Sequence, residues 1–324
     1  MPLLAALTAI LMWSSLATLT VSLAGVPPLY LTGMSLFIGG ALSLPWAMRW
    51  SLDWRSLAVG IYGQFTYHVL YIVALRSAPP VNANLVHYAW PLLILLMAPL
   101  TGQGLKLGWM HILAAAAAFS GVVLATSDGV ELSLRWHPGY GFALAAAFVW
   151  ATYSIAEARS KSSSTVDVGP ACMVSGLLAL AGHAAFEPPA SLDASQWMQM
   201  IALGVGPTGG AFYLWSVAMR RGDARIIGVL SNATPILSTL MLVVLGSRSM
   251  SLTTVGAALL VTASSIAVFL ASKRSCRGHT ISRDQPPLLS PPWRRSPTPP
   301  TAAACPPTPR SRSSACARPR RRCR

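Results

Sequence analysis

Charged side chains are scarce in this chain of 324 residues. Asp, Glu, Lys and Arg make up 10% of it, whereas hydrophobic residues make up 53%. Soluble domains carry about 25% charged residues, which they need to cover a water-facing surface. The composition therefore excludes a soluble globular enzyme and indicates a membrane protein.

Acidic residues are missing from the middle of every long apolar run. Carboxylates at membrane depth mark ion paths and proton relays, and paired carboxylates or metal ligands mark catalytic sites. Their absence argues against a carboxylate-driven antiporter, a pump, an ion channel and a membrane-embedded enzyme. The chain also lacks a phosphate-binding Gly-Lys-Ser/Thr loop, so we expect no nucleotide hydrolysis. The acidic residues of positions 1–272 lie at the ends of runs or between them: Asp53, Asp128, Glu131, Glu157, Asp167, Glu187, Asp193 and Asp223.

Cysteine is nearly absent from positions 1–272, where only Cys172 occurs. A single cysteine excludes a disulfide framework and a zinc-binding spacing in this part of the chain. The other cysteines follow without regular spacing, so we expect no metal site and no cofactor. They are Cys276, Cys305, Cys316 and Cys323.

Long apolar runs dominate what is present. A run of about 17–25 apolar residues is typical of a helix that crosses a membrane. The first run has no basic segment before it and is too long for a signal-peptide core, so we expect it to be retained. The sequence predicts an all-α polytopic membrane protein with ten spans, at 3–24, 27–48, 55–76, 81–101, 107–126, 139–158, 168–186, 197–219, 225–246 and 252–272.

Lys and Arg are distributed unevenly over the two sets of loops. Cytoplasmic loops carry the excess of these residues. One set has Arg76, Arg135 and Arg248, and the set on the side of the N-terminus has more than three times as many. We therefore expect both termini in the cytoplasm. The larger set is Arg49, Arg55, Lys106, Arg159, Lys161, Arg220, Arg221, Arg225, Lys273 and Arg274.

The last residues differ from the rest of the chain. Residues 273–324 are rich in Pro, Arg, Ser and Thr and contain a single acid, Asp284. This composition cannot bury enough apolar surface to fold, which predicts a disordered basic tail. The tail is either an electrostatic arm for anionic lipid or nucleic acid, or an appended segment with no role of its own. We favour the second interpretation and expect no nucleic-acid partner.

An internal repeat relates the two halves of the apolar part. Ala89, Pro91 and Leu93 fall on Ala233, Pro235 and Leu237 at a constant offset, and a similar offset places Trp13 on Trp150. The sequence therefore predicts a first repeat at 1–126, a second at 127–272 and the tail at 273–324. Five spans in each unit give the second copy the opposite orientation. Inverted repeats place the substrate near the midplane, between two halves that rock.

Neutral polar and aromatic residues occupy the interior of several predicted spans. Gln64, His68 and Tyr71 share one helical face because they follow at i, i+4 and i+7. Such groups suit a zwitterionic ligand with an aromatic or thioether side chain, and they offer no Arg or Lys clamp for a phosphate. The candidates on these spans are Gln64, Tyr67, His68, Tyr71, Asn84, His87, Tyr88, Trp90, Tyr213, Trp215 and Asn232.

Several of these residue types also have structural roles. We expect Trp residues near span ends to lie at the membrane interface, and the deeper Trp13, Trp90 and Trp150 to line a cavity. His111 and His183 are expected to be hydrogen-bonded structural residues. Pro91 and Pro235 each remove a helix hydrogen bond, and their repeat-related positions favour paired hinges. The interfacial group is Trp46, Trp50, Trp54, Trp109, Trp136 and Trp197.

Taken together, these features resemble the EamA branch of the drug/metabolite transporter superfamily. The segments Val86–Pro91, Val149–Tyr153 and Phe212–Ser216 are similar to the fourth-, sixth- and eighth-span patterns of YddG-type aromatic amino acid exporters. The resemblance covers residues 3–272. It departs at His87, where the family pattern has a small amide, and at His68, where related exporters carry an acid.

The resemblance implies a bacterial inner-membrane exporter of aromatic and other neutral amino acids, methionine among them. It implies a central cavity lined by Tyr67, Tyr88, Trp90, Trp150, Tyr213 and Trp215, and the sixth-span match adds Tyr153. The absence of a buried carboxylate favours facilitated diffusion by alternating access. One alternative is an EamA-type exporter of another small metabolite or drug. Another is a membrane sensor or scaffold that acts through the basic tail.

Overall fold

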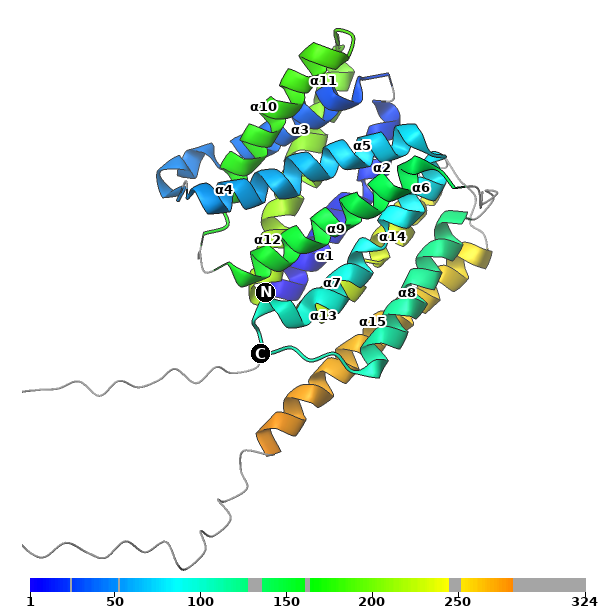
Figure 1. Cartoon of the computed structure of the whole chain (residues 1–324). Helices are drawn as coiled ribbons and strands as arrows, with labels where there is room; N and C mark the ends of the chain where they lie inside the picture. The colour runs from blue at the N-terminus through cyan, green and yellow to red at the C-terminus, as the bar shows by residue number, and fades with distance from the viewer. Residues whose placement is uncertain (24, 52, 128–135, 161–163, 245–251, 282–324) are drawn as a thin grey trace, which may run out of the picture. The chain divides into compact units, whose positions relative to one another are not determined.

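The computed structural model describes residues 1–23, 25–51, 53–127, 136–160, 164–244 and 252–281. Within these ranges every regular element is a helix (Figure 1), which confirms the all-helical prediction. The chain divides into two units, Met1–Ser272 and Lys273–Arg324. The prediction of a disordered tail from residue 273 is wrong for residues 273–281, which continue the last helix; residues 282–324 lie outside the described residues.

The helices of the first half are α1 (Pro2–Ser14), α2 (Leu16–Ser22), α3 (Pro28–Ala41), η1 (Leu44–Arg49), α4 (Trp54–Ile61), η2 (Tyr62–Thr66), α5 (Tyr67–Ser77), α6 (Pro80–His87), α7 (Trp90–Met97), η3 (Ala98–Thr101) and α8 (Trp109–Ser127). Those of the second half are α9 (Pro138–Arg159), α10 (Val168–Phe186), α11 (Ala194–Val205), η4 (Gly206–Gly210), α12 (Ala211–Arg221), α13 (Ala224–Leu230), α14 (Ala233–Val244) and α15 (Leu252–Ile281).

Proline and aspartate explain where many of these helices begin. Proline occupies the first position of α1, α3, α6 and α9, where its missing N–H would have no partner within the helix. Asp193 caps α11 by accepting from the Gln196 N–H at 2.8 Å, and Gln196 accepts from the Asp193 N–H at 3.0 Å. Asp53 and Asp223 cap α4 and α13 without the reciprocal bond, by accepting from the Ser56 and Arg225 N–H groups. Three of the few acids thus serve as helix caps.

Helices long and apolar enough to cross a membrane are present, although fewer than the ten predicted. In the described part of the chain there are five: Trp54–Ser77, Asn82–Thr101, Pro138–Arg159, Val168–Phe186 and Ala194–Arg221. Four shorter apolar helices accompany them. Some predicted spans are not among these five because a break divides the span into helices that are too short. For example, Ser15 divides the predicted span 3–24 into α1 and α2. A count of ten spans therefore remains a prediction.

Irregularities of the helices recur between the two halves. The π-helices η2 and η4 begin at Tyr62 and Gly206, and α5 and α12 follow them at Tyr67 and Ala211. Both pairs keep the offset that relates Pro91 to Pro235 in the sequence. The next span of each half is broken as well, at 88–89 between α6 and α7 and at 231–232 between α13 and α14, which is one residue short of that offset. The irregular elements therefore recur at a spacing close to that of the predicted repeat.

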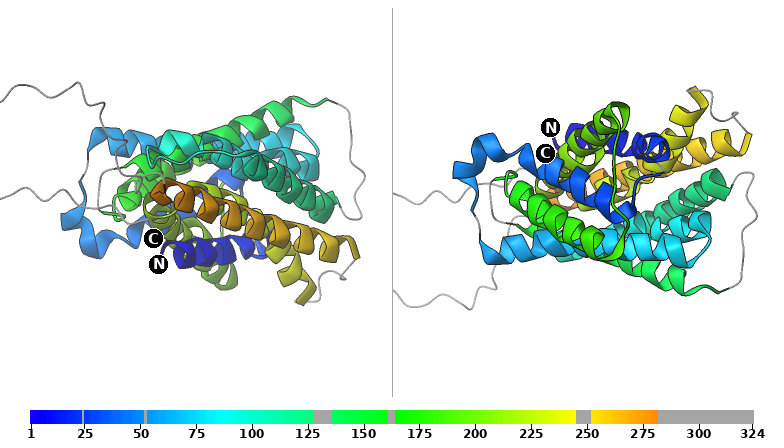
Figure 2. Two further views of the ribbon diagram at one scale, coloured as in Figure 1. Left: turned by 90° about the horizontal axis from the view of Figure 1, so that it is seen from below. Right: turned by 90° about the horizontal axis from the view of Figure 1, so that it is seen from above.

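The packing of helices crosses between the halves (Figures 1 and 2). Helix α1 packs on α12 and α14, and α9 packs on α5 and α7. Helix α3 packs on α10 and α11, and α10 also packs on α4. Each of these first-half helices thus has partners in the second half. The main core lies where α1, α7, α9 and α12 meet and consists largely of tryptophan and alanine.

Glycine allows α3 and α10 to approach closely. A Cβ atom at Gly176 would lie 2.7 Å from the Gly33 carbonyl oxygen, and one at Gly40 would lie 2.6 Å from the Gly169 carbonyl oxygen. Small residues bring membrane helices together in this way. The close contact fixes the two helices against each other along most of their length.

Candidate functional site

Four tryptophans from four helices form an aromatic cluster in the core. They are Trp13 on α1, Trp90 on α7, Trp150 on α9 and Trp215 on α12. The ring centroid of Trp13 lies 6.3 Å from that of Trp90, 5.7 Å from that of Trp150 and 5.1 Å from that of Trp215. The Trp13 indole donates to the Pro207 carbonyl oxygen at 3.0 Å, which ties α1 to η4. Edge-to-face pairs such as Trp13 and Trp90 are favourable beyond their burial.

A cavity of about 120 Å³, called here the aromatic cavity, opens beside this cluster. Its described lining contains no Asp, Glu, Lys or Arg. Rings, one amide and two threonines supply most of its surface. The lining residues are Trp13, Leu16, Tyr67, His68, Tyr71, Asn84, His87, Tyr88, Trp90, Trp150, Pro207, Thr208, Phe212 and Thr234.

Most candidate residues from the sequence meet in the aromatic cavity. Those that line it are Trp13, Tyr67, His68, Tyr71, Asn84, His87, Tyr88, Trp90 and Trp150. The aromatic cavity also has lining residues that the sequence analysis did not propose. Two of them, Phe212 and Thr234, are close to proposed residues in the sequence. Pro207 and Thr208 belong to a π-helix, which no periodicity in the sequence predicted, and Leu16 begins the short helix α2.

Five candidates lie away from the lining of the aromatic cavity. Trp215 is fully buried behind Trp150 and donates to the Ser154 hydroxyl at 3.0 Å. The Tyr213 hydroxyl donates to the Gly39 carbonyl oxygen at 3.1 Å, so this ring faces α3.

The other three are Gln64, Asn232 and Tyr153. Gln64 is fully buried, and Asn232 donates to the Val229 carbonyl oxygen at 3.0 Å at the break before α14. Tyr153 lines a second cavity, described below. Helical spacing alone could not separate these residues from the lining set, because it does not say which neighbouring helix covers a face.

Two polar side chains in the aromatic cavity lack partners within the described part of the chain. His87 has no hydrogen bond at either ring nitrogen, and Thr234 has none at its hydroxyl. Both side chains are more than nine-tenths buried. His68 differs because its Nδ1 donates to the Gln64 carbonyl oxygen. Buried polar groups are normally satisfied, so His87 and Thr234 are available to a ligand.

The two prolines proposed as hinges follow the helix breaks directly. Pro91 is the second residue of α7, and Pro235 is the third residue of α14. Their rings thus sit in the first turn after the break, where proline is tolerated. Tyr71 Oη donates to Asn84 Oδ1 at 2.7 Å and links α5 to the half-helix α6 before the first break.

The two histidines that were expected to have structural roles both have polar partners. His111 accepts from the Gly108 N–H at 3.1 Å and contacts the Ser272 hydroxyl at 3.2 Å. His183 lies 3.1 Å from a carboxylate oxygen of Glu187. Among the tryptophans expected at the interface, Trp46, Trp54, Trp109 and Trp136 are exposed.

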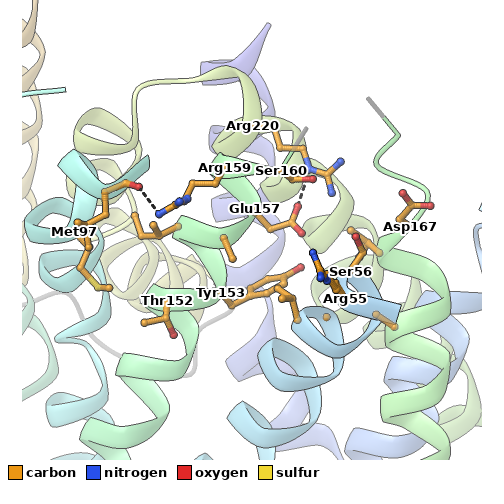
Figure 3. A pocket seen from close by; sticks show the side chains of 17 residues that line it. Arg55, Ser56, Met97, Thr152, Tyr153, Glu157, Arg159, Ser160, Asp167 and Arg220 are labelled. Atoms are coloured by element: carbon orange, nitrogen blue, oxygen red, sulfur yellow. Dashed lines mark hydrogen bonds and ion pairs between the residues drawn. The ribbon is translucent and has the colours of Figure 1, made fainter. Parts of the chain in front are cut away.

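A second and larger cavity, called here the Glu157 cavity, lies one turn further along α9 (Figure 3). Its volume is about 480 Å³. Unlike the aromatic cavity, it contains charged residues, of which Glu157 on α9 and Arg220 on α12 form an ion pair at 2.9 Å. The full set of charged lining residues is Arg55, Glu157, Arg159, Asp167 and Arg220.

Comparison with known families accounts for nearly all of the described chain. Residues 1–127 and 137–270 match the EamA-like transporter family. The chain belongs to this family. This EamA-like transporter is therefore a multi-pass membrane protein and is not expected to be an enzyme.

Three relatives of this EamA-like transporter bear the name aromatic amino acid exporter YddG. That of Ancylobacter novellus is 39% identical over 277 residues, which are 82% of this chain and 96% of the relative. That of Escherichia coli K12 is 27% identical over 60% of this chain and 68% of its own length. That of Salmonella typhimurium is 27% identical over 83% of this chain and 96% of its own length. The resemblance to YddG-type exporters seen in the sequence is thereby confirmed.

A crystal structure of a related protein has the same fold. It superposes with a TM-score of 0.79 at 38% sequence identity, and the match covers 84% of this chain and 97% of the other.

Proposed function

We propose that this EamA-like transporter exports aromatic and other neutral amino acids, methionine among them, across the inner membrane of a bacterium. The observation that carries the proposal is the aromatic cavity, in which rings from several helices surround the unpartnered His87 and Thr234. Rings suit an aromatic or thioether side chain, and neutral dipoles suit the charged ends of a zwitterion. The names of the relatives support the same substrate class.

The polar lining suggests how the substrate would be held. His87 and Tyr71 lie close together, with ring centroids 4.5 Å apart, and Tyr71 is linked to Asn84. A ligand that contacts His87 at the end of α6 would therefore also lie beside Tyr71 of α5, which is bonded to Asn84 of α6. Thr234 approaches from α14, across the cavity. Both helix breaks thus contribute to one binding site.

We propose alternating access between two inverted repeats. The recurrence of the π-helices and of the helix breaks at matching positions of the two halves supports this arrangement. The breaks before Pro91 and Pro235 divide each span into two half-helices, and rocking about them would open one mouth of the cavity while closing the other. Both termini would lie in the cytoplasm.

We propose facilitated diffusion rather than ion coupling. The described lining of the aromatic cavity has no carboxylate or lysine that could carry a coupled proton. The direct test is uptake of labelled phenylalanine, tryptophan and methionine into liposomes that contain the purified protein, with and without a pH gradient. Saturable uptake that needs no gradient is expected. Uptake that stops when the pH gradient collapses, with the substrate gradient kept, would contradict the mechanism.

The His87→Phe variant tests the position of the site. It keeps a ring of similar size and removes both nitrogens, so we expect a KM for phenylalanine about ten-fold higher, equivalent to one lost hydrogen bond. His137→Phe is the matched control, because it makes the same substitution at a histidine that lines neither cavity. Equal KM values in His87→Phe and the wild type would mean that the substrate binds elsewhere.

If none of the amino acids tested is taken up, the alternative of an EamA-type exporter for another small metabolite or drug is favoured. A role as sensor or scaffold would instead require the basic tail, and its removal tests that alternative below.

A further inference from the structure

The Glu157 cavity and the aromatic cavity meet at two contacting rings, those of Tyr153 and Trp150. Trp150 lines the aromatic cavity, Tyr153 and Glu157 line the other, and the three share one face of α9 at i, i+3 and i+7. The Tyr153 and Trp150 ring centroids are 5.4 Å apart. On its other side the Tyr153 ring packs on η2, where a Cβ atom at Gly63 would lie 2.3 Å from it. The two cavities are therefore adjacent compartments.

The Glu157 carboxylate has one oxygen committed and one available. Its Oε2 accepts from the Ser216 hydroxyl and from Arg220 Nε at 2.9 Å. Within the described residues no donor is bonded to Oε1. Because the side chain is only 10% exposed, this oxygen presents a negative charge in a sheltered position. Such an oxygen suits the ammonium group of a ligand.

Arg55 and Arg159 supply positive charge on either side of Glu157 (Figure 3). Neither has a carboxylate within ion-pair distance among the described residues. The Arg159 guanidinium donates to the Leu100 carbonyl oxygen at 3.3 Å, and the Arg55 guanidinium lies 5.4 Å from the Trp54 ring centroid. Both can therefore receive the carboxylate of a ligand.

The remaining wall of the Glu157 cavity is mainly apolar. Val59, Met97, Leu100, Ile155 and Ala171 form it, together with Tyr153. A ligand with both charges and an apolar side chain would satisfy all three parts of this surface at once. An organic anion would meet the Glu157 carboxylate, and an organic cation would leave both arginines unused.

We propose that the Glu157 cavity is a second substrate site, in which a neutral amino acid is held by its zwitterionic end before it passes Tyr153 into the aromatic cavity. This inference rests on the proposed function. The ammonium group meets Glu157, the carboxylate meets Arg55 or Arg159, and the side chain lies on Tyr153. Displacement of the Tyr153 ring together with that of Trp150 joins the two compartments.

The test is transport from each face of the membrane separately, in right-side-out and inside-out vesicles. The double variant Arg55→Gln, Arg159→Gln removes the two exposed cations without touching the ion pair of Glu157. We expect the KM for phenylalanine to rise at least ten-fold on the one face that this cavity serves, with kcat unchanged. On the other face KM should stay within two-fold and kcat should fall instead, because a passive carrier keeps kcat/KM equal in both directions. The matched control is Arg49→Gln, Arg221→Gln, which removes the same charge from exposed residues outside both cavities.

Inhibitors that lack one charge sharpen the test. On the affected face the double variant should bind phenylalanine and 3-phenylpropionate more weakly, while its inhibition constant for phenethylamine, which has no carboxylate, should not change. Unchanged KM values on both faces, or equal increases on both, would overturn the inference while leaving wild-type transport intact. Absence of wild-type transport from either face would overturn the proposed function and this inference together.

Discussion

Two buried carboxylates show how the surroundings of a residue decide its role. Glu157 pairs with Arg220 between α9 and α12. Glu187, directly after α10, accepts from the Leu29 N–H at 3.0 Å and pairs with Arg76 at 3.2 Å. The first borders a cavity, whereas the second holds the beginning of α3 against the end of α10.

The variant Glu157→Gln should destabilise the protein by about 3 kcal/mol, because it leaves the Arg220 guanidinium buried without its counter-charge. Both side chains are about nine-tenths buried. The free energy of unfolding in a detergent titration measures the loss. Arg221→Gln, at an exposed position one residue further on, should change it by no more than about 0.5 kcal/mol. The interpretation fails if the two variants are equally stable.

The Glu187 carboxylate should make stability sensitive to acid. Burial would raise its pKa, but hydrogen bonds from Leu29, His183 and Tyr30 and the charge of Arg76 outweigh burial and hold the pKa below the ordinary value of 4.5. A lowered folded pKa contributes stability that is complete above the ordinary value and is lost as the pH falls through the folded pKa. Melting temperatures of the wild type should therefore drop below about pH 4.5.

The control for this prediction is Glu187→Gln, which cannot lose a charge at this position. It should melt at a lower temperature than the wild type at pH 7 and show a smaller further drop in acid. Parallel melting curves for the two proteins across this pH range would contradict the assignment.

At the scale of elements, close packing and irregular helices have different functions. The glycine contacts bring the backbones of α3 and α10 close together. The π-helix η4 supplies Pro207 and Thr208 to the lining of the aromatic cavity, and η2 ends directly before the lining residue Tyr67. Single π-helical turns are frequent at functional sites because they re-aim the side chains that follow.

Gly176→Ala should destabilise the packing of α3 on α10. The added Cβ would lie 2.7 Å from the Gly33 carbonyl oxygen, which is backbone and cannot turn away, so a loss of about 1–3 kcal/mol is expected. Gly141→Ala on α9 is the matched control, because a Cβ there has open space around it. That variant should be neutral or gain up to about 1 kcal/mol. Thermal unfolding in detergent separates the two, and equal melting temperatures would show that α3 shifts to accommodate the methyl group.

For the whole molecule, the transport unit should be contained in Met1–Ser272. The family match ends at residue 270, before the basic tail. Removal of residues 275–324 should therefore leave the rate of phenylalanine uptake within two-fold of the full chain. Loss of all activity in a folded truncated protein would favour the scaffold role of the tail.

The class of fold and the family could be predicted from local features of the sequence. Scarce charge and long apolar runs require helices in a bilayer, because backbone polar groups must be satisfied within each span. The constant offset between Pro91 and Pro235 also anticipated where the helix breaks recur. Most residues that line the aromatic cavity could also be predicted from the sequence, because residues such as Trp13, Tyr71 and Trp90 occupy interior positions of the predicted spans.

Only the tertiary structure decided which side chains share a space. Trp215 and Tyr153 are interior aromatic residues like Trp150, yet one is buried behind the aromatic cavity and the other faces the Glu157 cavity. The ion pair of Glu157 and Arg220 joins two helices that are distant in the sequence. Spacing along a helix determines which residues share a face, but the rotation of that helix against its neighbours determines what the face meets. Here the packing of α9 against α5, α6, α7 and α12 set that rotation.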